Sequence, residues 1–211
     1  MDNSIKHIWF DVAGTLYEES ENFQAVHDNL RYETFSKAVN KPITDDLKLE
    51  YENLYKKHGS NSAVFSSLGL PSDYWQRAFG NMNLSEILKP NLKVNETLRK
   101  LGEIIPISLF TNFKKHKIEK ILDILSIDQS WFTHIINGDQ VKERKPALDG
   151  FHLMVEKSQL PAENILYVGD RVDVDIKPAK QVGMKTCLVY SESPEADYSF
   201  QNFEDILSIV E

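Results

Sequence analysis

Short apolar runs alternate with amphipathic stretches along most of this chain, and that alternation is typical of an α/β protein. Runs rich in β-branched and aromatic residues predict strands over Ile5–Asp11, Pro106–Thr111, His134–Asn137, Ile165–Gly169 and Lys185–Tyr190. Apolar residues at helical spacing predict helices between them, over Lys114–Leu125, Pro146–Lys157 and Ile176–Val182, with Gly183 as a C-cap. Because right-handed crossovers join strands that alternate with helices, we expect an α/β fold with a doubly wound parallel sheet and a Rossmann-like core.

The segment 17–89 has a different pattern, because it is helical throughout and rich in Tyr and Phe. Apolar positions recur near one helix face at Phe23, Val26, Leu30, Phe35 and Val39. Further helices are expected over Leu47–His58, which ends at Gly59, and over Pro71–Phe79 and Leu84–Leu88. We therefore expect a catalytic core made of residues 1–16 and 90–211, interrupted by an inserted all-helical cap at 17–89.

Composition narrows the class of protein further. The 211 residues carry a net charge of −8 without a basic block, which argues against a nucleic acid polymer as the partner. No run approaches the roughly 18 consecutive apolar residues of a membrane span, and the polar N-terminus lacks a signal-peptide pattern. The single cysteine, Cys187, lies in an apolar run and is expected to pack inside a strand. These features predict a cytoplasmic protein with no membrane contact.

Four segments place polar side chains at or near the ends of predicted elements, where open α/β sheets bind ligands. They contain Asp11 before a Gly-Thr turn, Thr111 after the second strand, Lys145 before Pro146, and Asp170 with Asp175 after a Val-Gly strand end. Each has an ordinary structural interpretation when it is considered alone. These are a turn carboxylate, a helix N-cap, a surface lysine in a charged run and an acidic loop.

In their order and spacing these segments resemble the haloacid dehalogenase (HAD) superfamily. The resemblance implies that Asp11 is the nucleophile of a phosphoryl hydrolase and forms an aspartyl-phosphate. Thr111 would hold a phosphate oxygen, and Lys145 would neutralise phosphate charge. The expected cofactor is Mg²⁺, held by Asp11, Asp170 and the main-chain carbonyl of Ala13, with Asp175 as a further metal-site residue.

A looser resemblance to the pyrimidine 5′-nucleotidase-type branch rests on Tyr55–Gly59, Leu84–Pro90, Phe110–Asn112 and Gly183–Cys187. It implies small phosphate monoesters as substrates, nucleoside monophosphates among them. The candidate substrate contacts are Asn112, Tyr17, Tyr55 and His58. The expected partner is a small phosphorylated metabolite, and the expected assembly is a monomer or a homodimer.

Ala13 departs from the phosphatases of this superfamily, which carry an acid–base Asp two positions after the nucleophile. Three explanations stay open. The position is an engineered replacement that traps the enzyme, or the chain is a phosphonatase-like enzyme that needs no such acid, or it is a catalytically idle relative that binds a ligand or protein. The dehalogenase branch also lacks this Asp, but it loses the acid after Gly169 as well, and here Asp170 is kept.

Overall fold

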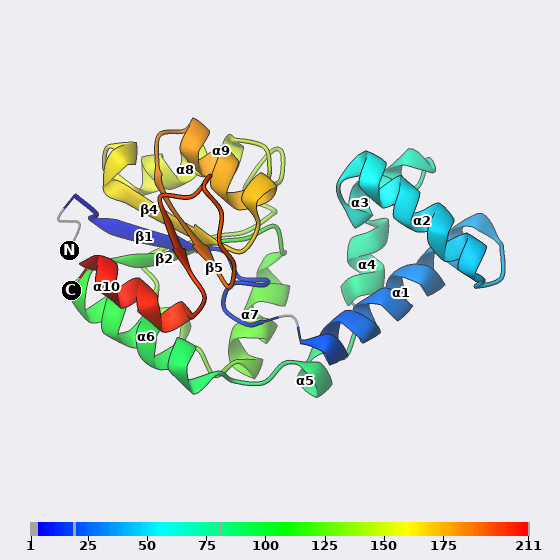
Figure 1. The fold of residues 1–211 in the computed structure, drawn as a ribbon, viewed down its shortest axis with the longest axis horizontal. Helices are drawn as coiled ribbons and strands as arrows, with labels where there is room; N and C mark the ends of the chain where they lie inside the picture. The colour runs from blue at the N-terminus through cyan, green and yellow to red at the C-terminus, as the bar shows by residue number, and fades with distance from the viewer. Residues whose placement is uncertain (1–3, 19, 81, 211) are drawn as a thin grey trace. The chain divides into compact units, whose positions relative to one another are not determined.

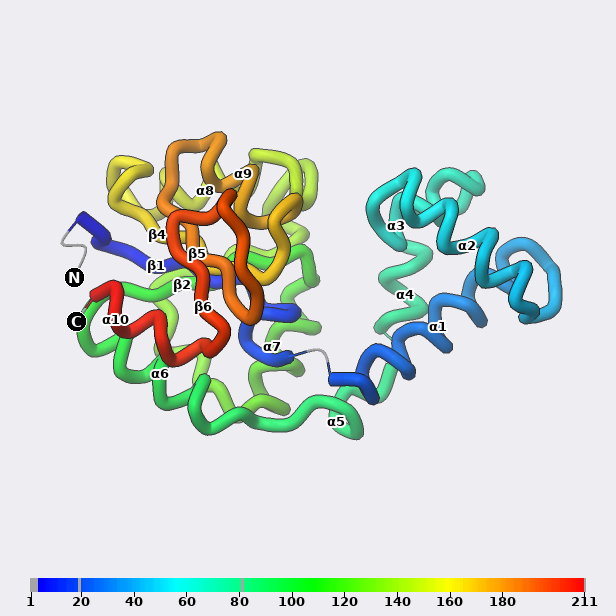
Figure 2. The backbone as a smooth tube through the Cα atoms, in the orientation of Figure 1, coloured from blue at the N-terminus to red at the C-terminus, as the bar shows by residue number. Residues whose placement is uncertain are grey.

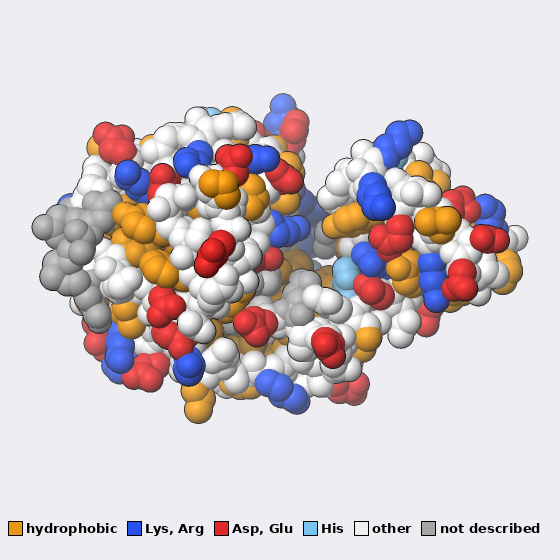
Figure 3. All heavy atoms as spheres, viewed as in Figure 1, with side chains coloured by type: hydrophobic (Ala, Val, Ile, Leu, Met, Phe, Trp, Pro, Cys, Tyr) orange, Lys and Arg blue, Asp and Glu red, His pale blue; other side chains and the backbone are white. Residues whose placement is uncertain are grey.

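The computed structural model describes residues 4–18, 20–80 and 82–210 and divides the chain into two compact units (Figures 1 and 2). The first unit comprises Met1–Glu18 and Leu88–Glu211, and the second comprises Glu19–Ile87. The sequence places these boundaries at residues 17 and 89. Each unit has its own buried core, and on the face drawn in Figure 3 both units carry intermixed acidic and basic side chains.

A six-stranded sheet with the order β3-β2-β1-β4-β5-β6 forms the centre of the first unit. The strands are β1 His7–Phe10, β2 Ile107–Phe110, β3 Ile135–Ile136, β4 Ile165–Gly169, β5 Lys185–Val189 and β6 Tyr198–Phe200. Every neighbouring pair is parallel, which confirms the predicted doubly wound sheet. Strand β1 lies centrally, between β2 and β4. The edge strand β6 was not predicted, because its three residues are half-buried and carry no apolar run.

Helices cover both faces of this sheet. They are α6 Leu92–Ile104, α7 Lys115–Ile124, α8 Asp149–Ser158, α9 Lys177–Gln181 and α10 Leu207–Val210. The short 3-10 helices are η1 Gln129–Trp131, η2 Ala162–Asn164 and η4 Phe203–Ile206, and η3 Val172–Ile176 is a π-helix. In Figure 1, α8 and α9 lie on one face, and α6 and α10 lie on the other.

The structure corrects one expected helix start and one expected helix cap. Helix α8 begins at Asp149, so Pro146 lies in the preceding turn, where its peptide bond with Lys145 is cis. Helix α7 begins at Lys115 after the N-cap Lys114, so Thr111 is not at the helix start. In both places the polar turn residues extend the loop that leaves the strand. These longer loops carry the candidate site residues.

Alternating side chains of β1 and β4 fill the two faces of the sheet. Trp9 and Tyr167 are in register and belong to one buried cluster with Phe151 of α8 and Ala179 of α9. On the other face the Phe10 ring lies 5.7 Å from the Phe203 ring. The strands of a parallel sheet that is packed on both faces are continuous apolar runs, and for this reason they could be recognised in the sequence.

The second unit is entirely helical over its described residues. Its helices are α1 Glu21–Val39, α2 Asp45–His58, α3 Asn61–Ser67, α4 Tyr74–Gly80 and α5 Leu84–Ile87. Thr44 caps the start of α2 by accepting a hydrogen bond from the N–H of Leu47, and Gly59 ends it with φ of +76°. Aromatic rings dominate the interior, with the Phe65 and Trp75 rings stacked 5.8 Å apart. No described helix in either unit combines the length and apolar character needed to cross a membrane.

Candidate active site

A tight turn after β1 carries Asp11 to the edge of the sheet. The main-chain N–H of Asp11 donates to the carbonyl of Val168 at 2.9 Å, so the residue continues the ladder between β1 and β4. The turn closes where the N–H of Leu16 donates to the Val12 carbonyl at 3.0 Å. Gly14 has φ of +75°, and a Cβ at this position would collide with the carboxylate of Asp170. Glycine is therefore required here both for the backbone conformation and for the close approach of two acidic segments.

Three carboxylates converge at the carboxyl ends of β1 and β4. One oxygen from each of Asp11, Asp170 and Asp175 lies within 4.8 Å of the other two. Asp11 and Asp175 are buried, with 2% and 0% exposure. Burial, together with the charges of Asp11 and Asp175, raises the pKa of Asp170 to about 7. Such crowding of like charges is unfavourable unless a cation shares the site.

The donor set of this cluster fits a divalent metal ion. Asp11 Oδ2 and Asp170 Oδ1 are buried, and neither has a hydrogen-bond partner among the described residues. Buried carboxylate oxygens are normally satisfied, so these two atoms point to an absent ligand. Oxygen ligands of this kind suit a hard cation such as Mg²⁺, which takes one or two carboxylates and retains water or substrate oxygens.

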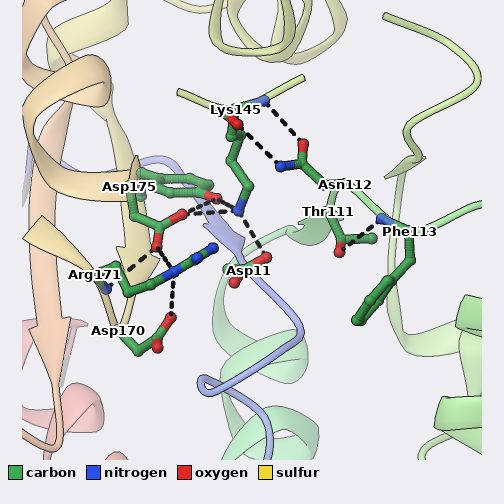
Figure 4. Close-up of polar contacts among 9 residues, drawn as sticks. Asp11, Thr111, Asn112, Phe113, Lys145, Asp170, Arg171 and Asp175 are labelled. Carbon is green, nitrogen blue, oxygen red and sulfur yellow. Dashed lines mark hydrogen bonds and ion pairs between the residues drawn. The ribbon is translucent and has the colours of Figure 1, made fainter. Parts of the chain in front are cut away.

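Lys145 connects two of these carboxylates (Figure 4). Its ammonium lies 2.7 Å from Asp11 Oδ1 and 2.8 Å from Asp175 Oδ1, and it donates to the Tyr167 hydroxyl at 2.8 Å. Burial alone would lower the pKa of Lys145, but Asp11 and Asp175 raise it above its ordinary value. Burial likewise raises the pKa of Asp11, and the Lys145 ammonium opposes that shift. The lysine therefore supplies a fixed positive charge beside the expected nucleophile.

The π-helix η3 explains how Asp175 reaches the site. The N–H of Ile176 donates to the Arg171 carbonyl at 3.3 Å, five residues back, and this wider turn keeps Asp175 fully buried. A Cβ at Gly169 would lie 2.5 Å from the Cβ of Asp175, so only glycine leaves room for this side chain. The Gly-Asp pair and the Asp five positions later therefore form one packed unit.

Thr111 and Asn112 follow β2, the strand beside β1. Thr111 is buried, and its Oγ1 accepts a hydrogen bond of 3.4 Å from the Phe113 N–H, so it organises the turn rather than capping α7. Figure 4 draws it on the opposite side of Asp11 from Asp170. The side-chain amide of Asn112 bonds to the main chain of Lys145 in both directions. The structure thus gives Asn112 a contact within the site that the sequence did not indicate.

Comparison with known proteins decides the family. A family model described as "Haloacid dehalogenase-like hydrolase" matches residues 8–189, which include every candidate site residue discussed above.

The chain belongs to the haloacid dehalogenase-like hydrolase family.

Curated relatives agree with this assignment and are named as phosphatases. A glyceraldehyde 3-phosphate phosphatase from Methanocaldococcus jannaschii is 27% identical over 98% of this chain and 97% of its own length. A protein of the same name from Pyrococcus abyssi is 31% identical over 86% of this chain and 80% of its own length. This HAD-like hydrolase is therefore an enzyme by family. The narrower nucleotidase resemblance stays a prediction.

Solved structures support the fold of this hydrolase. A haloacid dehalogenase-like family protein from Streptococcus pneumoniae superposes with a TM-score of 0.73 at 16% identity, and the match covers 99% of both chains. The HAD-hydrolase YfnB from Bacillus subtilis, described as bound to magnesium, gives a TM-score of 0.66 at 21% identity over 98% of both chains. At these identities the likeness shows the fold alone.

The remaining predicted residues of this hydrolase lie in both units. Ala13 and Tyr17 form an isolated bridge within the turn after Asp11, with Ala13 half-buried and Tyr17 buried. Tyr55 and His58 lie in the last turn of α2 in the helical unit and are half-buried there. The Tyr55 ring centre is 5.9 Å from the Arg31 guanidinium carbon. Substrate contact by Tyr17, Tyr55 and His58 stays a prediction.

Sequence reasoning missed two side chains of the HAD-like site. The Tyr167 hydroxyl lies 2.8 Å from the Lys145 ammonium and 3.2 Å from Asp175 Oδ1. Arg171 lies 3.9 Å by its Nε from oxygens of both Asp170 and Asp175. A tyrosine inside an otherwise apolar strand is a usable signal, because its buried hydroxyl requires a polar partner. For Arg171 the only signal is its position directly after the Gly-Asp pair.

Proposed function

We propose that this protein is a Mg²⁺-dependent phosphoryl hydrolase that acts on small phosphate monoesters through an aspartyl-phosphate at Asp11. The observation that carries the proposal is the ion-paired contact between Lys145 and Asp11 at 2.7 Å, beside two buried carboxylate oxygens that accept no hydrogen bond from the described residues. This arrangement combines a nucleophile, a fixed cation and a set of oxygen ligands in one buried place. The phosphatase names of the relatives agree with such chemistry.

The chain's own residues divide the work of phosphoryl transfer. The Asp11 carboxylate attacks phosphorus, the bond to the ester oxygen breaks, and that oxygen leaves with the bonding electrons. Lys145 keeps Asp11 oriented and offsets negative charge on the phosphoryl group. Thr111 supplies a hydroxyl at the end of β2. Water then attacks the phosphorus of the aspartyl-phosphate, which releases phosphate and restores Asp11.

Mg²⁺ would be held by Asp11, Asp170 and the main-chain carbonyl of Ala13, with Asp175 beside them. When bound, it supplies charge neutralisation for a phosphate dianion that approaches a carboxylate. The carbonyl of residue 13 is a main-chain group, so the alanine side chain leaves this ligand in place. The metal site is therefore compatible with the departure from the phosphatase pattern.

Ala13 determines which substrates can turn over. No side chain at this position can protonate a leaving alkoxide or activate water, and such groups typically contribute roughly 10²–10⁴-fold. Aryl and acyl phosphates, whose leaving groups need no proton, should therefore react faster than alkyl esters. The same alanine favours the second candidate function, a relative that forms or binds the phosphoryl adduct without turnover.

We further propose that the helical unit is a cap that selects the substrate. The half-buried side chains of Tyr55 and His58 offer surfaces for a leaving group. The relatives' names favour glyceraldehyde 3-phosphate and phosphoglycolate as small aliphatic esters to test, and the nucleotidase resemblance adds nucleoside monophosphates.

The test is phosphate release from an activated aryl phosphate and from these esters, with Mg²⁺ and with a chelator. The proposal predicts Mg²⁺-dependent release from the aryl phosphate that is lost in Asp11→Asn. Release that persists in Asp11→Asn or in the chelator contradicts it. If neither the wild type nor Ala13→Asp releases phosphate from any ester, the phosphonatase-like or purely binding candidate replaces it.

A further inference from the structure

Asn112 and Lys145 form a two-hydrogen-bond pair across 33 positions of sequence. Asn112 Oδ1 accepts from the Lys145 N–H at 2.9 Å, and Asn112 Nδ2 donates to the Lys145 carbonyl at 3.1 Å (Figure 4). One side-chain amide therefore bonds both polar groups of a single peptide residue. Two such bonds fix the direction of the main chain as well as its position.

The segment that carries Lys145 lies outside the described helices and strands. It lies between the end of β3 at Ile136 and the start of α8 at Asp149. Its first part is tied to the same turn, because the Gly138 N–H donates to the Phe113 carbonyl at 2.8 Å. A Cβ at Gly138 would overlap the carbonyl of Asn112, so the two loops are in close contact there. The turn at residues 112–113 therefore anchors this loop at both ends.

The ammonium of Lys145 requires accurate placement. Its three N–H groups match three acceptors, Asp11 Oδ1 at 2.7 Å and Asp175 Oδ1 and the Tyr167 hydroxyl at 2.8 Å each. The side chain is 1% exposed, so water cannot readily replace a lost partner. A shift of the Lys145 main chain by about 1 Å would break one or more of these contacts, and misplacements of that size can lower a rate by about 10²-fold.

We propose that Asn112 is a positioning residue of the phosphoryl-transfer site, which holds the Lys145 main chain so that its ammonium reaches Asp11. The inference rests on the proposed function for its catalytic consequence, but the structural link is independent of it. Asn112 acts through Lys145 and not on the leaving group. Its loss should therefore lower kcat while KM for an aryl phosphate changes little.

The test compares Asn112→Ala, Asn112→Asp and a matched control. Asn95→Ala removes the same kind of link, since Asn95 Nδ2 donates to the carbonyls of Leu125 and Ser126 at 3.0 and 3.1 Å in the same unit. Hydrogen exchange of the 139–148 segment should become faster in Asn112→Ala and stay unchanged in Asn95→Ala. The kcat for an aryl phosphate should fall by about 10- to 100-fold in Asn112→Ala only.

Asn112→Asp gives a signature that a general packing defect would not produce. Its carboxylate still accepts from the Lys145 N–H but repels the Lys145 carbonyl, whereas the protonated acid can donate to that carbonyl. Its kcat relative to wild type should therefore recover as the pH falls, and that of Asn112→Ala should not. This nearly isosteric variant also serves if Asn112→Ala does not fold.

Several outcomes would overturn the inference. Unchanged exchange in the 139–148 segment of Asn112→Ala removes the structural link. A raised KM with kcat retained assigns Asn112 to substrate contact instead. If neither the wild type nor Ala13→Asp releases phosphate from any ester, the proposed function fails, and the exchange measurement still decides whether Asn112 positions Lys145.

Discussion

Replacement of Asp170 by Asn should make the metal-free protein more stable. The Asp170 side chain is 23% exposed and shares its site with Asp11 and Asp175. Burial and the two neighbouring carboxylates raise its pKa from an ordinary 3.8 to about 7. Asparagine has nearly the same shape and carries no charge, so it removes this repulsion while it keeps the packing.

The sign and size follow from proton linkage. Between about pH 4 and pH 7 the folded protein holds a proton on Asp170 that the unfolded chain has lost, so the free energy of unfolding falls as the pH rises. Above pH 7 the accumulated loss is about 4 kcal/mol, since one pKa unit corresponds to about 1.4 kcal/mol. At pH 4.5 it is about 1 kcal/mol. Asp170→Asn should recover up to these amounts.

Urea unfolding in a chelator at pH 8 and pH 4.5 measures the effect. We expect the Asp170→Asn gain to be about 2–4 kcal/mol at pH 8 and about 1 kcal/mol at pH 4.5. Asp173→Asn is the matched control, because Asp173 is 81% exposed and should change stability by less than about 0.5 kcal/mol. Added Mg²⁺ should stabilise the wild type by mass action and leave Asp170→Asn unchanged. A destabilised variant at pH 8 in chelator, or equal gains at both pH values, would refute the reasoning.

Three further predictions concern the same site. Ala13→Asp should raise steady-state hydrolysis of alkyl phosphates by roughly 10²-fold, measured as phosphate release, and no gain would point away from phosphatase chemistry. Lys145→Met should lower the free energy of unfolding by about 3–5 kcal/mol in urea at pH 8, because two buried carboxylates lose their cation, and an unchanged free energy of unfolding would contradict this. Replacement of Tyr17, Tyr55 or His58 by alanine should change the ranking of phosphate esters by kcat/KM. The same replacements should have little effect on the rise in Tm that Mg²⁺ causes. An unchanged ranking in all three variants contradicts the cap proposal.

The core fold was predictable because its strands are buried on both faces. Continuous apolar runs such as Ile165–Gly169 mark central parallel strands, and their alternation with helices predicts right-handed crossovers. The edge strand Tyr198–Phe200 gives no such signal, since half-buried residues at a sheet edge follow no strict pattern.

Helix starts were less predictable for a related reason. Proline suits the first turn of a helix, so Pro146 was a reasonable helix start. The hydrogen bonds of the Lys145 main chain instead hold Lys145 and Pro146 in a loop, and the helix begins at Asp149. The π-helix at Val172–Ile176 likewise depends on the burial of Asp175 against Gly169, which local propensity does not express.

The site also contains residues that the sequence indicated and a contact that it did not. Asp11, Asp170 and Asp175 were found because strand ends and Gly-Asp spacing are local motifs that match the superfamily pattern, and the structure brings these three together with Lys145. The bond between Asn112 and Lys145 joins residues 33 positions apart, and no local pattern encodes such a pair.

The central claim is that Asp11 forms a covalent phosphoryl adduct, and intact-mass spectrometry tests it most directly. After the protein is mixed with an acyl or aryl phosphate and Mg²⁺, the account predicts an added phosphoryl mass that accumulates, because Ala13 cannot activate water for its removal. The adduct should be absent from Asp11→Asn. In Ala13→Asp it should form but have a shorter lifetime than in the wild type. An adduct that forms equally in Asp11→Asn, or no adduct with any activated phosphate, would contradict the claim.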